Sequence, residues 1–235
     1  MAAAPAAAGT DLWDSLLKAY VHGDYVDYAG WKANAADMAR LDQFLAWQGS
    51  AAPKSMSRDD QIAFYINAYN STNIQQVLSH YPLHSPMDVD GYFDKIKHHV
   101  AGEDLTVSEI EYDRLIAPFK DMRAHFTVVC SDRGCLPIRA GAWRGATLDA
   151  DLEAVAKKFV SDPRHFKADI AKKEIQISKI FEWYGAKFTA DPKRPAAKPE
   201  LFLLPYVDAD ARKLLESGDY TVKIIEWNWT LNEKR

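Results

Sequence analysis

The stretch His125–Arg139 constrains the fold more than any other part of the chain, because it holds both cysteines and changes character midway. Residues 124–130 are rich in β-branched and aromatic side chains, which predicts a buried strand. Ser131–Gly134 then supplies turn chemistry, since Ser and Asp side chains bond to the nearby backbone and Gly134 tolerates a positive φ. The sequence therefore predicts a strand that ends in an irregular polar loop, a common place for functional groups.

Cys130 stands at the end of this predicted strand, close in sequence to Arg133. If the two side chains are near in space, the charge of Arg133 favours the thiolate form of Cys130. One interpretation is a reactive thiol that serves as nucleophile, redox centre or metal ligand. The alternatives are a small buried side chain and one half of a Cys130–Cys135 disulfide.

His125 is not expected to pair with Cys130. Side chains alternate along a strand, so these two would lie on opposite faces. Five residues also span roughly 16 Å of strand, at ~3.3 Å each. A base for Cys130 must therefore come from another segment, and His125 is expected to be a hydrogen-bonded core histidine.

Length and composition are those of an ordinary globular protein, with 235 residues, 48% hydrophobic and 26% charged. The net charge is −4 and no basic run occurs, which argues against a nucleic-acid surface. No apolar run approaches the ~20 residues that a membrane span needs. Two cysteines are too few for a disulfide scaffold and lack the pattern of a structural zinc site. We expect a small molecule or peptide as partner, and no cofactor.

The first ten residues, Met1–Thr10, are small and featureless, and we expect them to be a disordered remnant. They lack the basic and apolar regions of a signal peptide. One interpretation is a mature periplasmic or extracellular protein whose signal peptide has been replaced by Met1. A short disordered start of a cytoplasmic protein would look the same.

Helical spacing dominates the rest of the chain, and strand patterns are few. The predicted helices cover residues 12–22, 32–47, 58–80, 107–116, 148–161, 181–188 and 201–217. Besides the central strand, alternation predicts strands at 174–180 and 220–229. We therefore predict one α+β domain over residues 11–235, with a helix-rich N-terminal half packed on a small, mostly antiparallel sheet.

Two amide side chains lie on an otherwise apolar face of the helix predicted at 58–80. Asn67 and Asn70 are three residues apart and so share that face. If they are buried they need partners, and we expect them to bond to the backbone of a neighbouring loop. The alternative is that they line a pocket beside the Cys130 loop.

Histidine and glutamate side chains supply the candidate bases. Adjacent residues of a strand face opposite sides, so His98 and His99 cannot jointly bind one metal, but one of them can face the site. Glu111 can serve as a general base, or as the ion-pair partner of Arg114 or Arg133.

Several segments together resemble the family of unknown function numbered 547: Tyr28–Trp31, Gln61–Asn70, Leu105–Ile116, His125–Cys130, Gly134–Pro137 and Ile180–Gly185. The resemblance covers about residues 25–229. It implies little about mechanism, because the family's function is not established. Bacterial members are often exported, which favours a secreted protein.

Two details of the resemblance bear on the site. The family usually has Glu-His where this chain has Glu111-Tyr112, so His98 or His99 would have to substitute if that histidine acts in relatives. In plant-type members the second cysteine is commonly Ser. This implies that a disulfide is not obligatory and that Cys130 is the more informative thiol.

The first functional hypothesis is a thiol-centred enzyme for acyl transfer or hydrolysis, possible on a papain- or transglutaminase-like architecture. Cys130 is then the nucleophile, and His98, His99 or Glu111 is the base. Amides of Asn67 or Asn70 steady the oxyanion. Arg133, Cys135 and His125 are further candidate binding residues.

Two other hypotheses compete with this one. The chain can be a binding or interaction domain in which Cys130–Cys135 is a structural disulfide. It can also hold a metal on Cys130, Cys135 and one of His98, His99 or His125, although that spacing matches no standard zinc pattern. On balance the sequence predicts no metal.

Overall fold

The fold is rich in helices. A computed structural model describes residues 6–234 of the chain. Helices account for 54% and strands for 12%, which confirms the α+β class. Contacts divide the chain into two compact units: unit 1 comprises residues 1–119, 127–149 and 229–235, and unit 2 comprises residues 120–126 and 150–228. The bounds predicted for the domain, 11–235, stay a prediction.

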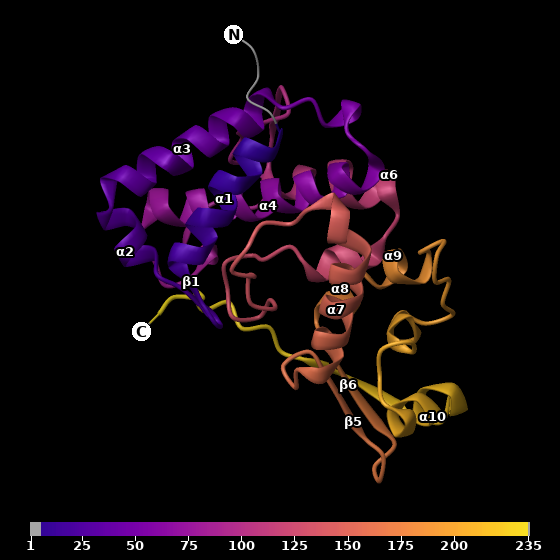
Figure 1. The fold of residues 1–235 in the computed structure, drawn as a ribbon. Helices are drawn as coiled ribbons and strands as arrows, with labels where there is room; N and C mark the ends of the chain where they lie inside the picture. Colours follow the sequence, from indigo (N-terminus) through magenta and orange to yellow (C-terminus); the bar gives the residue numbers. More distant parts are fainter. Residues whose placement is uncertain (1–5, 235) are drawn as a thin grey trace. The chain divides into compact units, whose positions relative to one another are not determined.

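Unit 1 is mostly helical, and α1 runs alongside α3 in it (Figure 1). Its helices are α1 (Ala6–Tyr20), α2 (Tyr28–Ala33), α3 (Ala35–Ser50), α4 (Arg58–His80), α5 (Val107–Glu109) and α6 (Ala117–Phe119), with a π-helix at Ile110–Ile116 and 3-10 turns at Pro53–Ser55, Pro86–Asp88 and Gly145–Thr147. Its strands form two short antiparallel hairpins, β1 (Val21–His22) with β2 (Tyr25–Val26) and β3 (His98–Val100) with β4 (Glu103–Leu105).

Aromatic side chains fill the core between the first helices of unit 1. Trp13 stacks on Phe44 with ring centroids 5.2 Å apart, and Tyr20 stacks on Trp31 at 4.6 Å. The four rings come from α1, α2 and α3, and all are buried. Offset aromatic pairs of this kind add to the stabilisation from burial alone.

The helix α4 is the longest element and is buried along most of its length. It covers residues 58–80, as predicted. The Ser57 hydroxyl accepts from the backbone N–H of Asp60, which caps the first turn, and two aspartates in that turn favour the helix dipole. At the other end the ammonium of Lys32 donates to the carbonyl of Leu78 at 2.7 Å. Both ends of α4 are therefore held by side chains from outside the helix.

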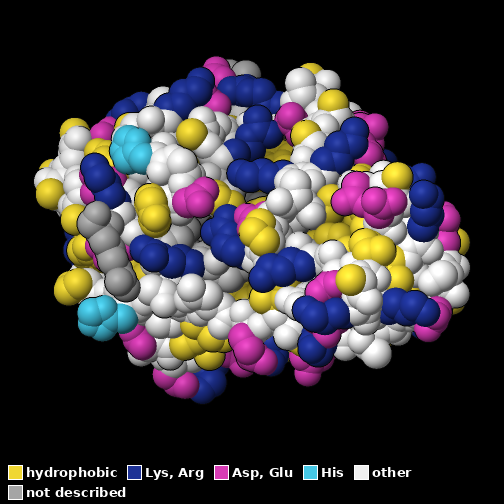
Figure 2. All heavy atoms as spheres, turned by 90° about the horizontal axis from the view of Figure 1, so that it is seen from below, with side chains coloured by type: hydrophobic (Ala, Val, Ile, Leu, Met, Phe, Trp, Pro, Cys, Tyr) yellow, Lys and Arg dark blue, Asp and Glu magenta, His cyan; other side chains and the backbone are white. Residues whose placement is uncertain are grey.

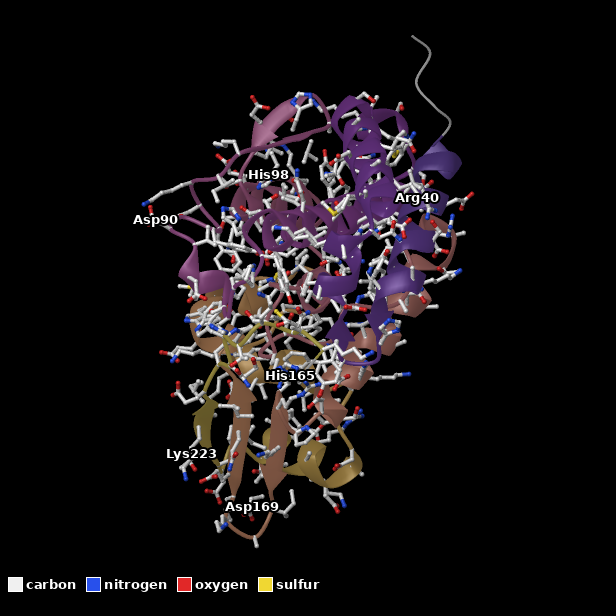
Figure 3. The ribbon with its side chains drawn as sticks, turned by 90° about the vertical axis from the view of Figure 1, so that its left-hand side faces the viewer. Arg40, Asp90, His98, His165, Asp169 and Lys223 are labelled. Carbon is white, nitrogen blue, oxygen red and sulfur yellow. The ribbon has the colours of Figure 1, made fainter. Side chains whose placement is uncertain are left out.

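Unit 2 contains a small mixed sheet, in the order β5-β6-β7, with helices in the same unit. Its elements are a 3-10 helix η4 (Met122–Phe126), α7 (Leu148–Ser161, whose first two residues belong to unit 1), β5 (Phe166–Asp169), β6 (Glu174–Ser178), α8 (Ile180–Trp183), α9 (Gly185–Thr189), a 3-10 helix at Pro199–Leu203, α10 (Ala209–Ser217) and β7 (Thr221–Ile225). β5 and β6 are antiparallel, and Asp169 stands at their hairpin end (Figure 3).

Phenylalanine rings form the core of unit 2. Phe126 stacks on Phe159 with ring centroids 4.2 Å apart and on Phe188 at 5.8 Å. Two histidines lie in this core: His125 meets the ring of Tyr184 edge-on at 4.5 Å, and His165 stacks on Phe159, also at 4.5 Å. His125 is buried, as the prediction of a core histidine required.

Two predictions about elements are wrong. Residues Ala6–Thr10 were expected to be disordered but form the start of α1, because alanine has the highest helix propensity; residues 1–5 lie outside the described part. Residues 124–130 form no strand, because polar side chains satisfy their backbone, as described below. The prediction of mostly antiparallel strands is confirmed: β7 pairs with β6 in parallel, but the other strand pairs described are antiparallel.

Candidate thiol site

The segment predicted as the central strand is irregular because polar side chains satisfy its backbone. At its start, the Asp121 carboxylate accepts from the backbone N–H of Arg123 at 3.3 Å, and this favours the 3-10 turn of η4. Further on, the Asn70 side chain donates to the carbonyl of Thr127 at 3.1 Å and accepts from the N–H of Val129 at 2.9 Å. One amide thus takes the place of a neighbouring strand.

A second amide of α4 binds another loop in the same way. The Asn67 side chain donates to the carbonyl of Trp143 and accepts from its N–H, both at 2.9 Å. Asn67 and Asn70 are both buried. The expectation that these amides bond to the backbone of neighbouring loops is confirmed, whereas their role as oxyanion donors stays a prediction.

Cys130 is half-buried and Cys135 is buried, and both are free thiols. The Cys130 sulfur lies 3.6 Å from the Tyr69 hydroxyl, whose ring comes from α4. The backbone N–H of Cys130 donates to the Cys135 sulfur at 3.1 Å. The structural disulfide of the binding-domain hypothesis is therefore not formed in this structure, although the two sulfurs are close.

Asp132 shapes the loop between the two cysteines. Its Oδ1 accepts from the N–H of Gly134 at 2.9 Å and from the N–H of Cys135 at 3.0 Å, which closes a turn around the carboxylate. The preceding residue, Ser131, has a positive φ of 61°. This left-handed conformation is uncommon outside glycine and persists only where the surroundings fix it. The loop is thus tightly held, and Asp132 is 1% exposed.

Residues 230–233 bind the outer side of this loop. The N–H of Asn232 donates to the Ser131 carbonyl at 3.1 Å, and the N–H of Arg133 donates to the Thr230 carbonyl at 2.9 Å. The Tyr28 hydroxyl donates to Asn232 Oδ1 at 2.8 Å. The loop therefore lies between α4 on one side and a C-terminal segment on the other.

Burial dominates the electrostatics of the site. Burial, followed by the charges of Cys130 and Glu111, raises the pKa of Tyr69 well above its usual value. Burial, the contact with Cys130 and the charge of Asp132 likewise raise the pKa of the Cys135 thiol. Tyr69 and Cys135 are therefore protonated at neutral pH, and each has a proton to donate.

The predicted histidine bases have other partners. His98 Nδ1 lies 3.0 Å from Gln75 Oε1, and burial lowers the pKa of His98 to about 4. His99 is exposed and pairs with Asp104 at 2.9 Å. Both belong to unit 1, where His98 lies on β3 (Figure 3), but no contact described here joins either of them to Cys130.

The arginines predicted as partners of Glu111 have other contacts in the structure, and the role of Glu111 stays a prediction. Arg133 lies over the ring of Tyr25 at 5.2 Å and donates to the carbonyl of Glu233 at 3.3 Å. Arg114, the other predicted partner of Glu111, pairs with Glu103 at 2.5 Å. Glu111 is buried and near enough to Tyr69 to affect its pKa, so it is the predicted base most closely linked to the thiol.

Sequence reasoning missed two members of the site. Tyr69 is not among the predicted site residues, and Asp132 is predicted only as a turn residue. The position of Tyr69 between two buried asparagines was the available signal, because polar side chains on one buried helix face converge on the same loop region. The hydroxyl–sulfur contact itself depends on tertiary structure.

A separate cavity of about 550 Å³ opens near the start of α4. Its wall includes the aromatic rings of Trp47, Phe64 and Trp143, together with Asp60 and Arg144. Asn67 also lines it, but Asn70 and Cys130 do not, so the predicted pocket beside the Cys130 loop stays a prediction. Its volume is in the range of small-molecule sites.

The exterior shows no large field of one charge on the face drawn in Figure 2, where Lys and Arg side chains are interspersed with Asp and Glu. Within residues 6–234, every helix is too short or too polar to cross a bilayer.

Comparison with known proteins places the thiol site in a family. Residues 53–160 match the family described as "Protein of unknown function, DUF547", which confirms the resemblance drawn from the sequence. The match includes α4, both cysteines and Asp132. No curated protein and no solved structure matches the chain significantly. Partners and a location outside the cytoplasm stay predictions.

Proposed function

We propose that this protein is a thiol-centred hydrolase or acyltransferase in which Cys130 is the nucleophile. The observation that carries the proposal is that the sulfur of the partly exposed Cys130 lies 3.6 Å from the hydroxyl of the buried Tyr69. Cys135 is the poorer candidate, because its thiol is buried and its pKa is raised. Reactive cysteines are those that combine access with polar neighbours.

Tyr69 is proposed to orient the attacking sulfur. Once Cys130 has lost its proton, the Tyr69 hydroxyl can only donate to it, and a donor to the charged form stabilises a thiolate. Glu111 is the proposed final acceptor of the thiol proton, since its charge already acts on Tyr69. Asn70 is a positioning residue, because it fixes the backbone that leads to Cys130.

The proposed reaction has two steps. The sulfur attacks a carbonyl carbon, a C–S bond forms, and the leaving group departs with the proton that Glu111 received. Water or another nucleophile then attacks the thioester, the C–S bond breaks, and the thiol is regenerated. Water gives hydrolysis, whereas an amine or alcohol gives acyl transfer.

The test uses p-nitrophenyl acetate as acyl donor and iodoacetamide as alkylating probe, both at pH 7. We expect C130A to abolish ester turnover, C135S to retain it, and Y69F to slow both turnover and alkylation by about tenfold. Retained turnover in C130A, or alkylation of Cys130 no faster than that of a short peptide thiol, would refute the proposal.

A second candidate function is ligand binding without chemistry, which the 550 Å³ aromatic cavity favours. Stacking on Trp143 and the charge of Arg144 suit a planar aromatic anion. Anilinonaphthalene sulfonate is a suitable probe. W143A and R144A should weaken its binding, whereas W183A, an exposed tryptophan outside this cavity, should not. Equal binding by all variants counts against this site.

A further inference from the structure

Three metal-ligating side chains converge in the loop that carries the proposed nucleophile. The sulfurs of Cys130 and Cys135 and a carboxylate oxygen of Asp132 all lie within 4.8 Å of one another. In a tetrahedral zinc site, metal–sulfur bonds of about 2.3 Å place two sulfurs about 3.8 Å apart. The two sulfurs therefore need to approach each other by about 1 Å at most to share one ion.

The surroundings of both sulfurs suit thiolate ligands. The backbone N–H of Cys130 donates to the Cys135 sulfur at 3.1 Å, and the Tyr69 hydroxyl lies 3.6 Å from the Cys130 sulfur. Outer hydrogen bonds of this kind orient the ligands of metal sites. Asp132 is oriented as well, because its Oδ1 accepts hydrogen bonds from two backbone N–H groups.

The charge of the loop favours a cation. Asp132 is buried, and its carboxylate places a negative charge close to both sulfurs.

We propose that Cys130, Asp132 and Cys135 bind one zinc-like divalent cation, with a fourth position open to solvent on the side of Cys130. Two thiolates and a carboxylate are a ligand set that Zn²⁺ accepts, and three protein ligands plus water are typical of catalytic zinc. The site differs from the metal hypothesis drawn from the sequence, because Asp132 replaces the histidine.

Binding exchanges protons for metal. Two metal–sulfur bonds form, both S–H bonds break, and two protons leave to the buffer for each ion bound. Affinity therefore rises with pH, by up to ~100-fold per pH unit while both thiols are protonated. Bound metal also occupies the Cys130 sulfur, so the loaded protein should resist alkylation.

The experiment titrates the metal-free, reduced full chain with Co²⁺ at pH 7.5 and follows thiolate-to-cobalt absorption. We expect one ion per chain, intense visible bands of tetrahedral geometry, and displacement by Zn²⁺, which binds such ligands more tightly. C130S, C135S and D132N should each weaken binding at least about tenfold. In D132N the side-chain oxygen of the new asparagine can still accept the hydrogen bonds of the turn, so only the charge is lost. D90N makes the same change at the exposed Asp90 and is the matched control (Figure 3).

Two results would overturn the metal site: no thiolate-to-cobalt band, or equal affinity in D132N, C135S and the parent protein. This inference does not rest on Cys130 being a nucleophile. If metal-free protein turns over the ester rapidly but binds no Co²⁺, the result refutes the metal site and leaves the proposed enzyme standing. Stoichiometric Co²⁺ binding supports it even where metal-free protein has no turnover, a result that removes only the proposed enzyme.

Discussion

Asn67 and Trp143 form a closed pair, in which one side-chain amide satisfies both the N–H and the C=O of one backbone residue at 2.9 Å. The pair is buried and joins residues 76 positions apart. Three residues further along the same helix, Asn70 does the same for the backbone at Thr127 and Val129. Two amides on α4 thus organise two loops.

Removing the Asn67 amide should destabilise the protein substantially. N67A leaves a buried N–H and a buried C=O without their partner, and each unsatisfied group is worth about 1–3 kcal/mol. We expect a loss of about 2–4 kcal/mol in the free energy of unfolding, measured with urea. Q43A, which removes an exposed amide from α3, is the control and should change stability little. Equal effects of both variants would contradict this account.

Removing the Asn70 amide should loosen the approach to Cys130. In N70A the Val129 N–H loses its acceptor, so hydrogen exchange at Val129 should speed up more than exchange in the centre of α4. Stability should fall by about 2–3 kcal/mol. Mass spectrometry of exchange in the peptide containing residues 127–135 measures the effect. Unchanged exchange there would show that Asn70 does not hold the segment.

The third prediction concerns the buried ion pair between Asp121 and Arg123 in unit 2. Asp121 accepts from the Arg123 guanidinium at 2.7 Å, and both side chains are at most 5% exposed. Burial alone would raise the pKa of Asp121, but hydrogen bonds from Arg123 and Lys193 outweigh it and hold that pKa below its usual value. The pair therefore stabilises the fold above the ordinary aspartate pKa and loses this contribution as pH falls through the folded-state pKa.

D121N should therefore lower the free energy of unfolding at pH 7 by about 1–3 kcal/mol, because the buried Arg123 loses one carboxylate partner and keeps its ion pair with Glu153. The difference between D121N and the parent protein should shrink below pH 4. D169N removes an exposed partner of Lys172 and should have little effect. Urea unfolding at pH 7 and pH 3 measures both variants. A larger effect of D169N than of D121N would contradict the argument.

His165 should make the protein sensitive to mild acid. Burial lowers its pKa to about 4 from the usual 6.5, and its ring is 1% exposed. The unfolded chain therefore binds a proton that the folded chain refuses between these two values. The stabilisation is fully present above pH 6.5 and is lost progressively down to about pH 4, a change of roughly 3 kcal/mol.

H165F tests this assignment, because a phenyl ring can keep the stack on Phe159 without a titrating group. Chemical unfolding from pH 7 to pH 4 should show a smaller loss of stability in H165F than in the parent protein. His98 has a similarly lowered pKa, so H98Q is a useful companion variant. Identical pH profiles of H165F and the parent protein would disprove the role of His165.

Local signals in the sequence predicted the parts of the fold that local interactions determine. Ser57 and the two aspartates that follow it mark the start of α4, and Thr106 with Glu109 forms a capping box at the start of α5. The strand at 124–130 was wrong because its backbone partners, such as Asn70, lie far away in sequence. His125 and Cys130 were placed on opposite faces of that strand. Because residues 124–130 form no strand, this reason for separating the two side chains no longer holds.

The candidate site was only partly predictable for the same reason. Cys130, Cys135 and the two asparagines stand out by residue type. The contact of Cys130 with Tyr69 and the convergence of Asp132 on the sulfurs arise when separate segments meet. Whether His98 or His99 faced the site could not be read from a strand pattern, because the side chain of Gln75 and the charge of Asp104 determine their positions.

The hydrogen bonds from residues 230–232 to the cysteine loop have a consequence for biosynthesis. Ser131 and Arg133 are translated about a hundred residues before the segment that secures them. On the ribosome, α4 and its asparagines can gather the first half of the loop, but the second half must wait until Asn232 has emerged. The cysteine loop is therefore completed late, once the C-terminal segment that binds it has been translated.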